Sequence, residues 1–193
     1  MMATNDEMTD ELTEDPVLRM RSRFWRTTEE GGGVLHVETW VDPGGGVTPH
    51  IHPAMEERFE VVDGQPEFLA GRQWNVTEPG DKVLVPPGTR HAFRNRSGDV
   101  AHFVCQATPP STLQEFLEDA AALSRAGGIT RRALPRSLDG LLQAAVMAHH
   151  YRDMVTLLAP LPPPAIQRLV IPPLARAGER RGYHAGSIGR DAR

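Results

Sequence analysis

The chain has 193 residues, a length that suits one globular domain with a modest extension and is short for two full-sized domains. Its 18 glycines and 17 prolines make up about 18% of the chain, more than the roughly 12% that the pair makes up in average proteins. They follow no collagen-like period, and 39% hydrophobic residues exclude a fully disordered chain. The net charge of −4 does not favour nucleic-acid binding. The uncharged stretch 154–167 is too short for a membrane span and contains four prolines.

The first 15 residues are polar and acidic, with no lysine or arginine. This composition predicts a disordered acidic tail over residues 1–15. The segment lacks the positive start and apolar core of a secretory signal, so we expect a cytoplasmic protein. The single Cys105 agrees, because one cysteine allows no intramolecular disulfide, and its apolar neighbours indicate a strand residue rather than a reactive thiol.

The next part of the chain has the pattern of a β structure. Apolar or small residues alternate with arginines over 18–24, and 34–41 is rich in β-branched and aromatic residues. Short apolar runs bounded by glycine or proline follow at 57–62, 66–70, 82–85, 91–94 and 100–106. Strands at this spacing predict an all-β sandwich or barrel, which we place at residues 16–110.

Two segments of this region combine histidines with turn residues. In the first, 44–64, His50 and His52 are two residues apart, so on a strand their imidazoles project to one side, about 7 Å apart along the strand. In the second, 80–95, a strand enters a Pro-Gly turn and the next strand begins at His91. A third imidazole can therefore reach the same space.

Both segments resemble the two motifs of the cupin superfamily, G-x5-H-x-H-x4-E-x6-G and G-x5-P-x-G-x2-H-x3-N, and every defining position matches. The likeness covers about residues 31–110. It implies a double-stranded β-helix, or jelly-roll barrel, with one metal ion inside. Carried over position by position, it implies the metal ligands His50, His52, Glu57 and His91.

The adjacent Glu56 is the alternative to Glu57. The six-residue gap to Gly64 fits Glu57, and on a strand Glu57 shares a face with Phe59, opposite Arg58. We therefore expect Glu57 to point into the barrel.

A set of three imidazoles and one carboxylate suits one divalent transition metal per chain, Fe, Mn, Ni, Cu or Zn, and suits Ca or Mg poorly. Four protein ligands leave up to two positions open for water, dioxygen or a small organic molecule. A metal there would polarise a carbonyl group or lower the pKa of a bound water. The alternative without chemistry is that the histidines are satisfied by hydrogen bonds, or that a metal only stiffens the barrel.

The resemblance implies an enzyme, since cupins of similar size and motif include dioxygenases, isomerases, lyases and polyketide cyclases. The leading hypothesis is a dioxygenase-like oxidoreductase, an enzyme whose metal activates dioxygen or polarises a small oxygen-rich or aromatic substrate. The alternatives are a non-redox isomerase, lyase or cyclase, and a non-enzymatic module that senses or carries a small molecule. The resemblance also implies a homodimer, which would cover a barrel edge strand.

Other side chains of the barrel are candidates for substrate contact. Polar residues alternate along 36–40 and 102–106, but the sequence does not fix which face of either strand lines the barrel. We take His102 as a substrate contact, together with Phe59 and Phe93, which share faces with Glu57 and His91. Ordinary core packing is the alternative for the two phenylalanines.

The pattern becomes helical after residue 110. Ser111 and Gln114 form a capping-box pattern, and a helix is predicted over 112–126. A second helix is predicted from Ser137 as N-cap to about residue 159, where prolines end it. A short apolar helical piece interrupted by Pro172 and Pro173 follows. We therefore expect a helical extension at 111–178 and a basic flexible tail at 179–193.

Overall fold

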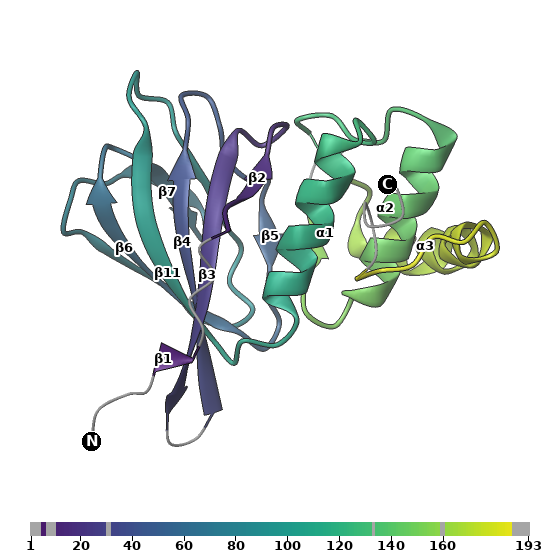
Figure 1. The fold of residues 1–193 in the computed structure, drawn as a ribbon, viewed down its shortest axis with the longest axis horizontal. Coiled ribbons are helices and arrows are strands. Elements are labelled where there is room, and N and C mark those ends of the chain that lie inside the picture. Colours follow the sequence, from purple (N-terminus) through teal and green to yellow (C-terminus); the bar gives the residue numbers. More distant parts are fainter. Residues whose placement is uncertain (1–4, 7–10, 30–31, 133, 159–160, 187–193) are drawn as a thin grey trace.

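The fold is two facing β-sheets with three helices at one side, next to β2 (Thr13–Asp15) and β5 (His50–Ile51) (Figure 1). This computed structural model describes residues 5–6, 11–29, 32–132, 134–158 and 161–186. All the strand pairs it describes are antiparallel. The predicted all-β core with a C-terminal α-helical part is confirmed.

One sheet has seven strands in the order β1-β3-β4-β11-β6-β9, with β2 also paired to β3. Its other strands are β1 (Asn5–Asp6), β3 (Met20–Glu29), β4 (Gly32–Val41), β6 (Glu56–Asp63), β9 (Lys82–Val85) and β11 (Ala101–Thr108). The second sheet has five strands in the order β12-β5-β10-β7-β8. Besides β5 it contains β7 (Glu67–Ala70), β8 (Gln73–Val76), β10 (His91–Arg94) and β12 (Thr156–Leu157).

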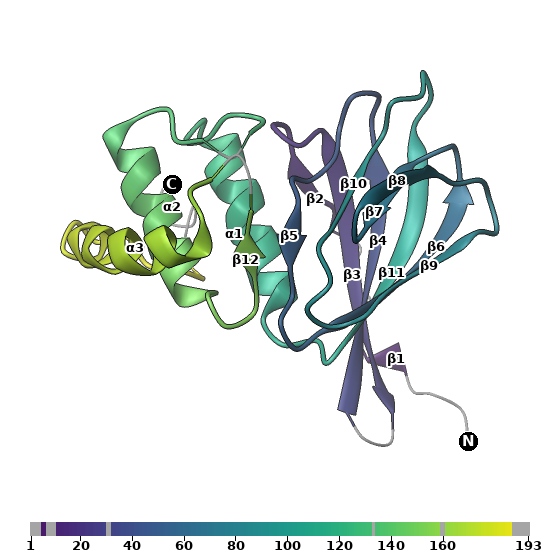
Figure 2. The same ribbon diagram turned by 180° about the vertical axis from the view of Figure 1, so that it is seen from behind.

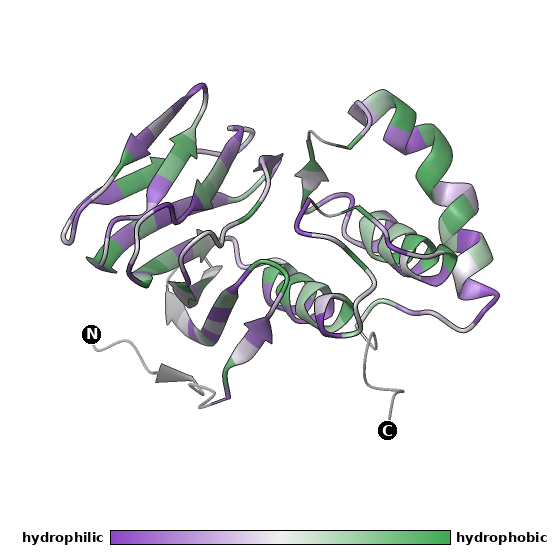
Figure 3. Cartoon of the chain, turned by 90° about the horizontal axis from the view of Figure 1, so that it is seen from above, coloured by the Kyte–Doolittle hydropathy of each residue, from purple (hydrophilic) through white to green (hydrophobic). Residues whose placement is uncertain are grey.

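Side chains alternate between the two faces of the long strands, and hydropathy alternates with them (Figure 3). The inward residues form the core, and its centre is a cluster of four aromatic rings. Phe103 lies 4.8 Å from Phe93, 5.2 Å from Phe68 and 5.8 Å from Phe59 between ring centroids. The cluster packs between the sheets.

Several strands differ from the predicted ranges. The strand predicted at 18–24 begins at Met20 and continues to Glu29, because it pairs with β4 along its whole length. The polar β8 (Gln73–Val76) was not predicted, since it pairs only with β7 and buries almost no apolar surface.

The prediction that residues 1–15 are disordered does not hold for Asn5–Asp6, which pairs with β3, or for the end of the segment. Thr13–Asp15 is a strand, and Asp15 is buried. The Asp15 carboxylate accepts hydrogen bonds from the Ser124 hydroxyl and from the backbone N–H groups of Val17 and Leu18. Residues 1–4 and 7–10 lie outside the described residues.

The three helices are α1 (Leu113–Arg125), α2 (Leu138–His150) and α3 (Pro164–Glu179). Ser137 caps α2 as predicted, accepting a 3.0 Å hydrogen bond from the Gly140 N–H. The capping box predicted at Ser111 does not form. The N-cap of α1 is Thr112, without a side-chain hydrogen bond, and the Gln114 amide instead donates to Glu118.

Two further helix predictions need correction. The second helix ends at His150 rather than near residue 159, because the chain turns there and enters β12. Pro172 and Pro173 lie inside α3 and do not interrupt it. Their missing N–H groups would have bonded the carbonyls of Arg168 and Leu169, and both of these residues are exposed, so water can take that place.

The helical part is joined to the barrel by backbone pairing. Thr156 lies opposite Ile51 and Leu157 opposite His50, which makes β12 the edge strand beside β5 (Figure 2). The buried Asp119 of α1 accepts hydrogen bonds from the Tyr151 hydroxyl and the Gly186 N–H. No described helix is both long and apolar enough to cross a membrane. The expected homodimer, cytoplasmic location and flexible basic tail remain predictions, and residues 187–193 of that tail lie outside the described residues.

Candidate metal centre

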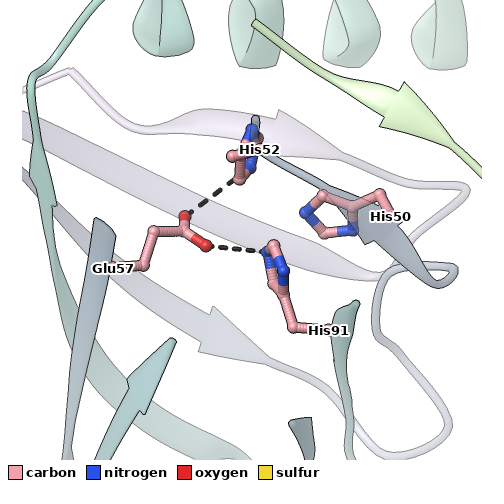
Figure 4. A group of neighbouring side chains, drawn as sticks. All are labelled: His50, His52, Glu57 and His91. Carbon is pink, nitrogen blue, oxygen red and sulfur yellow. Dashed lines mark ion pairs between the residues drawn. The ribbon is translucent and has the colours of Figure 1, made fainter. Parts of the chain in front are cut away.

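Four side chains from both sheets converge inside the barrel (Figure 4). His50 on β5 is the strand partner of His91 on β10, and His52 follows β5 directly. Glu57 comes from β6 in the opposite sheet. One ligand atom from each residue lies within 4.8 Å of every other, and they are the only such group among the described residues. The sequence-predicted ligands are thus brought together.

Turns of the two motifs hold these strands in place. Gly64 ends β6 with a positive φ of 77°, and a Cβ there would lie 2.6 Å from the Val100 carbonyl oxygen. Gly88, with φ of 76°, donates its N–H to the His52 carbonyl at 2.8 Å. Asn95 is a structural residue, because its buried amide donates to the carbonyls of Val41 and Asp99.

All three imidazoles are oriented by backbone carbonyls. The Nδ1 atoms of His50, His52 and His91 each lie 2.9 Å from a carbonyl oxygen, those of Thr48, Met154 and Thr89 respectively. A carbonyl oxygen can only accept, so each Nδ1 carries the hydrogen. Every Nε2 lone pair is therefore left to face the centre, which is the arrangement typical of metal-binding histidines.

Two atoms of the centre are buried without a hydrogen-bond partner among the described residues, Glu57 Oε2 and His91 Nε2. They lie 2.7 Å apart, and His52 Nε2 lies 3.8 Å from Glu57 Oε1. Because His91 already donates through Nδ1, its neutral ring would present a lone pair to the carboxylate. A cation between them, a proton or a metal ion, satisfies both atoms, so the residues present fit a metal.

The electrostatics of the group agree with this fit. Burial lowers the pKa of His50 to about 3, and the neighbouring His91 and His52 act in the same direction. Burial also lowers the pKa of His52. For Glu57, burial alone would raise the pKa, but the contact with His91 and the nearby imidazoles outweigh it and lower the pKa to about 2. Burial alone would lower the pKa of His91, and the Glu57 carboxylate outweighs it, so that pKa is raised. Neutral His50 and His52 beside an ionised Glu57 are competent donors for a divalent cation.

The structure also separates Glu57 from its neighbour. Glu57 is buried, whereas Glu56 accepts a 2.8 Å hydrogen bond from the exposed Arg58 guanidinium. The predicted inward position of Glu57 is therefore observed. Cys105 lies next to it, with Sγ 3.7 Å from Glu57 Oε1. Burial raises the pKa of the Cys105 thiol well above its ordinary value, so the thiol stays protonated.

The group opens onto a cavity of about 600 Å³ that Phe59 and Phe93 help to line. His102 does not line this cavity, contrary to the prediction that it contacts the substrate. It lies on the opposite face of β11, where its ring stacks on Trp40 and its Nε2 is 2.9 Å from Glu38 Oε1. The pairing of β11 with β4 turns Phe103 inward and therefore His102 outward.

Sequence reasoning missed the part that the C-terminal region plays in the centre. Met154, whose carbonyl orients His52, follows α2 and is 102 residues away along the chain. A backbone carbonyl carries no side-chain signal, so no motif could have pointed to it.

The chain is similar to one known family and to several solved structures. The cupin domain family model matches residues 37–106. Similar solved structures include an RmlC-like cupin from Shewanella frigidimarina, 18% identical with a TM-score of 0.46, where the match covers 57% of this chain and 96% of that one. KdgF from Halomonas sp. is 19% identical with a TM-score of 0.46, and the match covers 55% of this chain and 94% of KdgF. The polyketide cyclase RemF from Streptomyces resistomycificus is 25% identical with a TM-score of 0.40, and the match covers 46% of this chain and 64% of RemF.

No curated protein matches the sequence at a significant level. The family match spans the first motif from Gly44 and the second motif to Asn95, both complete in this chain. It also spans every residue of the four-residue group. Residues 37–106 are therefore a cupin domain.

Proposed function

We propose that this chain is a metal-dependent enzyme that acts on a small organic molecule with dioxygen. Its centre is His50, His52, Glu57 and His91, holding one Fe, Mn, Ni, Cu or Zn ion. The observation that carries the proposal is the convergence of three Nε2 lone pairs and a carboxylate, within 4.8 Å of one another, at the wall of a cavity of about 600 Å³. Such a mixed nitrogen and oxygen set suits these metals.

The residues of the chain prepare this centre before any ligand binds. Backbone carbonyls fix the direction of each imidazole, so little reorganisation is needed when a cation enters. The rings of Phe59, Phe93 and Phe103 form an apolar wall that limits access of water. When bound, the metal would supply Lewis acidity and an open position for dioxygen or for an oxygen atom of the substrate.

The cavity wall carries titratable side chains besides the metal centre. His149 and Asp153 line its helical side. In the barrel, Asp15 also lines it and already accepts hydrogen bonds from Ser124, Val17 and Leu18. The dioxygen-dependent hypothesis therefore rests on the donor set of the centre and its open positions. A non-redox isomerase, lyase or cyclase stays the alternative.

The direct test is elemental analysis of protein purified without added metal, paired with an oxygen-uptake screen over catechols, flavonols and diketones. We expect close to one transition-metal ion per chain and oxygen uptake with at least one substrate class. Folded protein that binds no metal would contradict the proposal. Product formation without oxygen uptake would favour a non-redox isomerase, lyase or cyclase. Binding of metal and ligand without turnover would favour a sensing or carrier module.

The two neighbouring glutamates provide a matched pair of variants. Glu57→Gln is expected to lower metal affinity by roughly 100-fold or more, because loss of a direct ligand should cost more than loss of a group that only orients a ligand. Glu56→Gln changes the adjacent residue, whose side chain contacts Arg58 instead of the centre, and should leave metal affinity unchanged. Metal titration of both variants by calorimetry measures the difference. Equal affinities would show that Glu57 is not a ligand.

A further inference from the structure

The cavity extends well beyond the four-residue group. Its volume of about 600 Å³ lies within the range of roughly 300 to 1,000 Å³ typical of small-molecule sites. From the barrel it continues to the helical part, where α1 and α2 form much of the wall. Apart from His149, the residues of α1 and α2 that line it are apolar, including Leu113, Phe116, Leu117, Ala144 and Met147.

This helical wall is fixed to the barrel. The β12 strand pairs with β5 beside His50, and Met154 holds His52. Gly140 of α2 packs so closely on the loop after α1 that a Cβ on it would lie 2.2 Å from the Gly128 carbonyl oxygen. The helices therefore keep a set distance from the metal centre, and the space between them has a defined length.

Polar side chains line both the barrel part and the helical part of the cavity. In the barrel, the buried hydroxyls of Ser22 and Thr39 face each other at 3.4 Å, longer than an ordinary O–H···O hydrogen bond, so both keep capacity for a ligand oxygen. At the outer end, the exposed Arg152 and Arg168 lie at the rim. Most of the other lining residues are apolar, with Asp15, Thr48 and His149 among the exceptions.

We propose that the cavity binds an amphipathic substrate, with an oxygen-bearing end in the barrel and a hydrocarbon body against α1 and α2. The helical part, and not the barrel alone, then determines which substrates are accepted. The proposal rests on the proposed function in one respect, that the oxygen-bearing end is held at the metal centre.

A series of straight-chain hydroxamic acids tests this on the metal-loaded full chain, because each carries the same oxygen chelator on an alkyl body of different length. Calorimetry would measure affinity from acetohydroxamic to decanohydroxamic acid. We expect affinity to rise roughly fourfold for each added methylene until the cavity is filled, as burial of apolar groups predicts.

Variants of α2 locate the body of the ligand. Ala144 and Ala148 are one helical turn apart and both line the cavity. Ala148→Phe should shorten the chain length at which affinity stops rising, with acetohydroxamic acid unaffected. Ala144→Phe tests the same wall if the first variant is unstable. Ile166→Phe, at an exposed position on the side of α3 opposite its cavity-lining residues, is the control and should behave as the unchanged protein.

The outcomes separate the two proposals. If acetohydroxamic acid binds the metal-loaded protein but longer chains bind no tighter, the substrate class is wrong and the metal centre stands. The same holds if Ala148→Phe and Ala144→Phe fold normally and leave the length dependence unchanged. If the protein takes up no metal, the proposed function itself fails, and elemental analysis detects this before any hydroxamic acid is added.

Discussion

Loss of stoichiometric metal is the expected result of combining His50→Ala with His52→Ala. Two of the four donors disappear, and the remaining Glu57 and His91 can satisfy each other with a shared proton at their 2.7 Å separation. The fold should survive. The lost hydrogen bond from His52 to the Met154 carbonyl, which links the barrel to the helical part, contributes only about 1 kcal/mol to the free energy of unfolding. Metal content and β-rich circular dichroism are the measurements.

A thermal scan sharpens this experiment. A metal that binds the folded state raises the melting temperature, so added metal should stabilise the unchanged protein and not the double variant. His102→Ala, which removes an imidazole from the outer face of β11, is the control and should retain full metal content. Full metal occupancy in the double variant would overturn the ligand assignment.

The centre was predictable from sequence because its signals are local. The spacing between His50, His52 and Glu57 is set by one short segment, and strand alternation placed Glu57 inward beside Phe59. His91 is more distant in sequence, but it begins a strand directly after the Pro-Gly turn, as its motif indicates. In each case a few neighbouring residues decide where the side chain points.

The unpredicted features depend on contacts between distant segments. Strand β11 has apolar residues on both faces, Phe103 inward and Val104 outward, so only its pairing with β4 and β6 placed His102 outside. Strand β12 has two residues and no pattern of its own, and it exists because β5 offers a free edge. Met154 acts through its backbone. These are tertiary effects that periodicity cannot express.

The orientation of β11 leads to the second large expected effect. Phe103 is 1% exposed and touches three other aromatic rings between the sheets. Phe103→Ala should lower the free energy of unfolding by about 3–5 kcal/mol, since it removes a large buried side chain and leaves a cavity in a packed core. Urea denaturation followed by circular dichroism would measure the change.

Val104 is the matched control, because it is the next residue on the same strand and lies on the outer face between β4 and β6. Val104→Ala deletes fewer carbon atoms from a half-buried position, so its effect should be about 1 kcal/mol or less. A larger loss for Val104→Ala than for Phe103→Ala would mean that β11 presents its other face to the core. His102 would then point into the barrel, and its exclusion from the cavity would have to be withdrawn.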